Sequence, residues 1–90
     1  MSEAGDTPRF RPGVKFRFDP VREAWVVLAP EKLILPDEIA VEVLKRVDGQ
    51  RTVTLIVDGL AEDFQAPREV IDKDVRALLA DMVGKGAISL

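Results

Sequence analysis

Hydrophobic and polar residues alternate from Val14 to Phe18, where Lys15 and Arg17 take the polar positions. A period of two is typical of a half-buried β-strand. The stretch Trp25–Ala29 is rich in β-branched and aromatic residues and predicts a second strand. The two predicted strands form a hairpin with a fairly long loop over Asp19–Ala24.

A third apolar run, Lys32–Leu35, is short and lies between two prolines. Pro30 ends the second strand because a proline cannot donate to a strand ladder, and Pro36 ends the third run. These runs predict a three-stranded antiparallel sheet. If the third strand lies at its edge, the unpaired N–H and C=O groups there are open to an added strand.

Apolar residues recur every three or four positions in the rest of the chain, which is typical of amphipathic helices. Thr52 is expected to N-cap the second helix, and Pro67 precedes the third. A last short strand is expected at Ala87–Leu90. The apolar positions that define the three helices lie within residues 39–47, 53–64 and 71–83.

The order of these elements predicts a winged-helix-like α+β fold, with a three-stranded antiparallel N-terminal sheet followed by three helices. A chain of 90 residues has material for one core. We expect a single domain over residues 9–90. Residues 1–8 are expected to form a flexible tail, because small and acidic residues there have little to bury.

Composition excludes most catalytic chemistry. The chain has no cysteine, histidine or tyrosine, so thiolates, the commonest metal ligand and the usual general base are absent. The carboxylates of Asp58, Glu62 and Asp63 are better explained as the solvated face of a helix than as an acid–base pair. We therefore expect a binding domain, not an enzyme, with no metal site and no cofactor.

Nucleic-acid binding is the alternative that a winged-helix outline raises. The formal net charge is −3, and the third predicted helix carries three cations against four anions. Because affinity for DNA needs the opposite balance, we expect no nucleic-acid partner. No apolar run approaches the ~20 residues that span a bilayer, so we expect a cytoplasmic protein with no membrane partner.

Several short segments at fixed spacings carry a family resemblance. They are Arg9–Val14, Leu28–Leu35, Ala40, Leu44, Asp48–Val53, Ile71–Val75, Leu78–Leu79 and Gly86. Together they resemble the pyrroloquinoline quinone (PQQ) biosynthesis protein D family, over nearly all of the chain from Arg9 onward. Two positions depart from the family's pattern. Pro36 stands where asparagine is frequent, so Asp37 is expected to cap the first helix, and Phe64 stands where tyrosine is common.

The resemblance implies a peptide chaperone rather than an enzyme. Such proteins bind the leader of the ribosomal precursor peptide of PQQ and present it to a radical-SAM enzyme, which joins a glutamate and a tyrosine of the peptide. The leader lies as an added strand between the third strand and the third helix. The alternatives are non-catalytic winged-helix modules that bind nucleic acid, or that bind the enzyme but no peptide.

Carried over to this sequence, the groove uses the backbone of the third strand and side chains of the third helix. We expect a monomer, although an open edge also permits strand exchange between two chains. The implied peptide-binding residues are Lys32, Leu33, Ile34 and Leu35 on the strand and Ile71, Val75, Leu78 and Leu79 on the helix.

Overall fold

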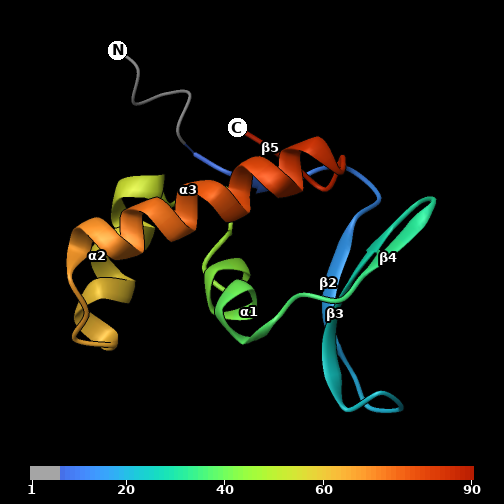
Figure 1. The fold of residues 1–90 in the computed structure, drawn as a ribbon. Coiled ribbons are helices and arrows are strands. Elements are labelled where there is room, and N and C mark those ends of the chain that lie inside the picture. Colours follow the sequence, from blue (N-terminus) through green and yellow to red (C-terminus); the bar gives the residue numbers. More distant parts are fainter. Residues whose placement is uncertain (1–6) are drawn as a thin grey trace.

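The computed structural model describes residues 7–90, and its elements follow the predicted order with one short strand added before them (Figure 1). A three-stranded antiparallel sheet followed by three helices is confirmed. The elements are β1 (Arg9–Phe10), β2 (Lys15–Asp19), β3 (Ala24–Ala29), β4 (Lys32–Ile34), α1 (Glu38–Leu44), α2 (Val53–Asp63), α3 (Arg68–Gly84) and β5 (Ile88–Ser89).

The main sheet has the strand order β2–β3–β4. Val27 of β3 lies opposite Phe16 of β2 and Ile34 of β4, so these three side chains share one face. That face is turned to the core, because Val27 is 0% exposed and Ile34 only 8%. Lys15 and Arg17 alternate with Phe16 and are exposed on the opposite face, as the period-two pattern predicted.

A second sheet joins the two ends of the described chain. Phe10 of β1 lies opposite Ile88 of β5, and the Arg11 N–H donates to the Ala87 carbonyl at 3.0 Å. Gly86, with φ +78°, makes the turn from α3 into β5. The strand at β5 was predicted and β1 was not, because two residues are too few for an alternating pattern to appear.

Side-chain caps begin the first two helices. The Ala40 N–H donates to the Asp37 carboxylate at 2.8 Å, and the Leu55 N–H donates to the Thr52 hydroxyl at 3.1 Å. Both caps were predicted. The helix α1 ends at Leu44, earlier than expected, because the chain tightens into a turn in which the Val47 N–H donates to the Leu44 carbonyl at 3.1 Å.

One core serves the sheet and the helices. α3 packs on α2 and also contacts α1 and β5, and Figure 1 shows α3 crossing above α1 with the main sheet to one side. The core side chains come from all three helices, from the strands β3, β4 and β5, and from the adjoining turns. They include Val27, Ile34, Val43, Leu44, Val53, Ile56, Val57, Leu60, Val75, Leu79, Met82 and Ile88.

The expected flexible tail falls mostly outside the described residues, since residues 1–6 are not among them. Pro8, the last residue assigned to that tail, has a fully buried side chain. The packed part of the fold therefore extends to this proline, one residue before β1.

Candidate functional site

The strand β4 has one open edge. Among residues 7–90 it pairs with β3 on one side and with no strand on the other. A two-residue turn separates the two strands, so Ala29 and Lys32 close the hairpin as a hydrogen-bonded pair. Because hydrogen-bonded and non-bonded pairs alternate along an antiparallel ladder, Ile34 also bonds to β3. The N–H and C=O of Leu33 therefore point away from β3, toward the open edge.

Apolar side chains accompany this free backbone. Ile34 is directed at the core, whereas the side chain of Leu33 is 40% exposed and that of Leu35 is 61% exposed. Lys32 is exposed at the turn. The open edge thus offers the main-chain groups of Leu33, with the accessible leucine side chains of positions 33 and 35 nearby.

The opposite edge of the sheet, along β2, differs in character. Lys15 and Arg17 are exposed there, and charged side chains on an edge strand discourage pairing with a further chain. Of the two outer strands of this sheet, β4 is the better template for an added strand.

The helix α3 supplies the second wall. Ile71, Val75 and Leu78 follow one another at intervals of four and three residues, so they form one stripe along the helix. Ile71 and Leu78 are partly buried. Val75 and Leu79 are each only 1% exposed and belong to the core. The four helix residues named from the sequence therefore divide into two accessible and two packed side chains.

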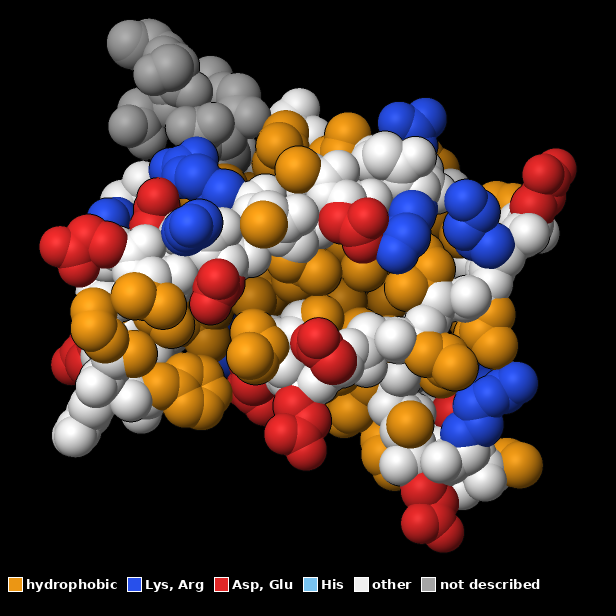
Figure 2. Space-filling model, viewed as in Figure 1, with side chains coloured by type: hydrophobic (Ala, Val, Ile, Leu, Met, Phe, Trp, Pro, Cys, Tyr) orange, Lys and Arg blue, Asp and Glu red, His pale blue; other side chains and the backbone are white. Residues whose placement is uncertain are grey.

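Between α3 and α1 lies a hollow of about 820 Å³. Figure 2 shows its floor as a continuous hydrophobic surface. Ile71 and Val75 line it, but Leu78, Leu79 and Lys32–Leu35 do not. Its apolar lining includes Trp25, Pro36, Ile39, Phe64, Ile71 and Val75. Because Pro36 comes two residues after the end of β4, the hollow begins where the open edge stops.

Several lining residues are not among the site residues predicted from the sequence. Ile39 and Phe64 fit the apolar stripes of the first two helices, yet their side chains are 65% and 55% exposed. Their periodicity is that of core residues, so it gave no sign of accessibility. The sequence pattern marks Trp25 as a strand residue, and it marks Pro36 as a strand breaker and as a departure from the family's asparagine, so neither is predicted to line a site.

Trp25 stands in an aromatic row that ties the hairpin to α1. Its ring centroid lies 4.9 Å from that of Phe16 and 5.9 Å from that of Phe18. The Lys45 ammonium lies 5.1 Å from the Trp25 ring centroid, a cation–π contact between β3 and the end of α1. The tryptophan thereby forms a fixed wall of the hollow.

Charges around the hollow are predominantly negative. Glu42 accepts from Arg46 at 3.1 Å and lies 3.7 Å from the Lys45 ammonium. Glu38 and Asp74 also line the hollow, and neither is in an ion pair with another residue of the described chain. Figure 2 shows acidic side chains over α3 and over α1 on either side of the hydrophobic floor.

Comparison with known proteins identifies the family. The family model described as Coenzyme PQQ synthesis protein D (PqqD) matches residues 24–88. The chain belongs to the PqqD family. The matched span runs from β3 to β5, so it contains the open strand edge and both sides of the hollow. The resemblance seen in the sequence is confirmed.

Relatives from several bacteria are similar over most of this chain. A PqqA binding protein of Rhodopseudomonas palustris is 45% identical over 99% of this chain and 86% of its own length. The PqqA binding protein of Bradyrhizobium diazoefficiens is 49% identical over 83% of this chain and 73% of its own length. In Methylorubrum extorquens the similar region, 42% identical over 89% of this chain, is 22% of a bifunctional coenzyme PQQ synthesis protein C/D.

Solved structures confirm the fold. One is the solution structure of the PqqD part of Methylobacterium extorquens PqqCD, a recognition element for ribosomally synthesized and post-translationally modified peptides. It matches this chain with a TM-score of 0.81 at 37% identity, over 100% of both chains. Lasso peptide synthetase B1, complexed with its leader peptide, has the same fold at 15% identity, with a TM-score of 0.79 over 93% of this chain and 99% of its own.

The binding domain expected from the sequence agrees with these relatives, which are a PqqA binding protein and a recognition element. Within residues 7–90, no three acidic side chains gather in a way that could hold a metal ion. None of the helices described is both long and apolar enough to cross a membrane.

Proposed function

We propose that this chain binds the leader of the PqqA precursor peptide as a strand added to β4, and presents the peptide to a radical-SAM enzyme that joins a glutamate and a tyrosine. The observation that carries this proposal is the open edge of β4, which ends beside an apolar hollow. The relatives described as PqqA binding proteins support the choice of peptide.

The proposed site consists of the edge and the helix wall together. Leu33 offers its backbone groups, and Leu35 extends the edge toward the hollow. Ile71 and Leu78 are accessible enough to contact a peptide, while Val75 contributes to the lining from the core. Leu79 supports the wall from beneath, because its side chain is 1% exposed.

Both parts are needed on energetic grounds. Ordering a flexible peptide costs about 1–2 kcal/mol per residue, and a main-chain hydrogen bond returns a net 0.5–1.5 kcal/mol, roughly. The hydrogen bonds of an added strand therefore offset the cost of ordering the peptide only approximately, and leave little net binding free energy. Burial of apolar surface contributes about 25 cal/mol per Å², so side chains placed in the hollow must supply most of the net affinity.

Amide hydrogen exchange tests strand addition at single residues. The N–H groups of Lys32 and Ile34 face β3 in the free protein, whereas that of Leu33 faces the open edge. Saturating PqqA should slow exchange at Leu33, by about a hundredfold at a peptide concentration of 100 Kd, and should leave Lys32 and Ile34 much less affected. Equal protection at all three amides, or protection confined to β2, would contradict the proposed site.

Presentation to the enzyme needs a separate assay. Holding the peptide near the enzyme raises its effective concentration without new chemistry. Adding the chain should therefore lower the PqqA concentration at which the radical-SAM enzyme forms the glutamate–tyrosine bond at half its maximal rate. If the chain binds PqqA but leaves that concentration unchanged, the presentation step is wrong and peptide capture stands.

A further inference from the structure

The carboxylates of Glu38 and Asp74 flank the hydrophobic hollow from opposite sides. Glu38 begins α1 and Asp74 lies in the N-terminal half of α3, and both line the hollow. Neither has an ion-pair partner among residues 7–90. Most other acidic residues of the helices differ, because they pair within the fold, as Asp72 does with Arg76 at 3.0 Å and Asp58 with Arg68 at 2.6 Å.

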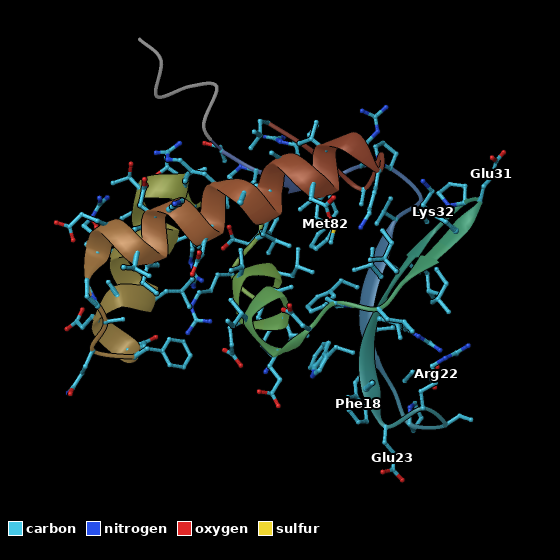
Figure 3. All side chains as sticks on the ribbon, in the orientation of Figure 1. Phe18, Arg22, Glu23, Glu31, Lys32 and Met82 are labelled. Carbon is cyan, nitrogen blue, oxygen red and sulfur yellow. The ribbon has the colours of Figure 1, made fainter. Side chains whose placement is uncertain are left out.

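Lys45 is the only basic residue that lines the hollow among the described residues, and it already has two partners. The Lys45 ammonium lies over the Trp25 ring and 3.7 Å from Glu42. Glu42 also accepts from Arg46 at 3.1 Å. Glu23 is acidic too, but Figure 3 shows its side chain pointing away from the molecule at the tip of the hairpin. Around this apolar surface, Glu38 and Asp74 therefore have no ion-pair partner within the part of the chain that the structure describes.

From this arrangement we infer that the hollow selects a peptide segment in which a bulky apolar side chain stands next to a lysine or arginine. The apolar side chain lies against Ile39 and Ile71, and the cation lies between Glu38 and Asp74. The inference rests on the proposed function, and it adds which part of a peptide gives specificity. Main-chain bonds at β4 are blind to sequence, whereas the hollow distinguishes both size and charge.

The test compares two pairs of substitutions that change net charge equally. The variant Glu38→Gln/Asp74→Asn neutralises the two carboxylates at the hollow. The control Glu62→Gln/Glu69→Gln neutralises two carboxylates that do not line it. Affinity for PqqA is measured by calorimetry at 50 mM and 500 mM salt, with a second PqqA in which every lysine and arginine is replaced by glutamine.

We expect the Glu38/Asp74 variant to bind PqqA about threefold to tenfold more weakly than the control at low salt, because partly exposed ion pairs contribute modestly. High salt should reduce the difference, since it screens exposed charges. With the neutralised peptide, the variant and the control should bind alike. This coupling separates a direct charge contact from a change in the fold.

Two other results have distinct meanings. If PqqA binds but the variant and the control lose the same affinity, the carboxylates select nothing and this inference is overturned, while the proposed function stands. If the unmodified chain does not bind PqqA at all, the proposed function fails, and the inference fails with it.

Discussion

The geometry of β4 makes a sharp prediction for the backbone of Leu33. Its N–H faces the open edge and has no role in the ladder with β3, so Leu33→Pro removes a donor that only an added strand would use. Proline is tolerated on an edge strand when its missing N–H faces away from the neighbouring strand. Leu33→Ala is the matched control, because it keeps the N–H and also loses the leucine side chain.

The expected loss of affinity follows from a single hydrogen bond. A main-chain bond contributes a net 0.5–1.5 kcal/mol, roughly, which corresponds to about a twofold to tenfold change in Kd. Leu33→Pro should therefore bind PqqA that much more weakly than Leu33→Ala. Trp25 is the only tryptophan of the chain and lines the hollow, so its fluorescence can follow the titration.

Thermal unfolding of the two variants shows whether a loss of affinity comes from a destabilised fold. Both variants should unfold within a few degrees of each other, because neither removes a bond to β3. Equal affinities for PqqA would show that the Leu33 N–H is not used. A Leu33→Pro chain that fails to fold would show that this N–H belongs to the β3 ladder, and that the alternation along β4 is reversed. Either result refutes the reasoning.

Three further substitution sets probe the site and the fold. Ile71→Asp should fold and weaken PqqA binding, whereas Val75→Asp, at a side chain 1% exposed, should fail to fold by circular dichroism, because an unpaired carboxylate would be buried. Gly59→Ala should raise the free energy of unfolding by about 0.5–1 kcal/mol, whereas Gly86→Ala should lower it by about 1–2 kcal/mol, because Gly86 has φ +78°. An added Cβ meets nothing within 4 Å at either site, so the two substitutions differ only in backbone conformation. Equal changes in the free energy of urea unfolding would contradict this prediction. The Arg51 and Gln50 N–H groups hold the pKa of the Asp48 carboxyl below its ordinary value of 3.8, so the carboxylate stabilises the fold fully above that pH and less as pH falls. The difference in free energy of unfolding between the parent chain and Asp48→Ala should therefore narrow below pH 3.8. A difference that stays unchanged down to pH 2 would contradict the prediction.

The sequence predicted the fold well where local chemistry decides it. Alternation and the two prolines defined β2 to β4, and Asp37 and Thr52 cap the helices as expected. The strand β1 was missed because its pairing with β5 joins residues 80 positions apart, Arg9 and Ser89. No local pattern in a two-residue strand reports a partner that distant.

The candidate site was less accessible to sequence reasoning, because one periodic pattern covers two kinds of apolar residue. Val43 and Ile39 occupy the same stripe of α1, yet Val43 is 1% exposed and Ile39 65% exposed. The burial of each residue in the stripe depends on how closely α1 packs against α3. Tertiary packing sets that distance, and the local sequence pattern does not report it. The same argument separates Leu79 from Leu78 on α3.

The hollow and the core share one wall, and this limits which substitutions can inform on function. Val75 lines the hollow and is also packed in the core, so a substitution there disturbs the fold and the site together. Ile39 and Phe64 line the same hollow while 65% and 55% of their side chains stay exposed, so the fold gains little from them. Large apolar side chains kept accessible around a single hollow support the proposed contact with a peptide. Substitutions at these two positions should therefore separate peptide binding from stability, which those at Val75 and Leu79 cannot do.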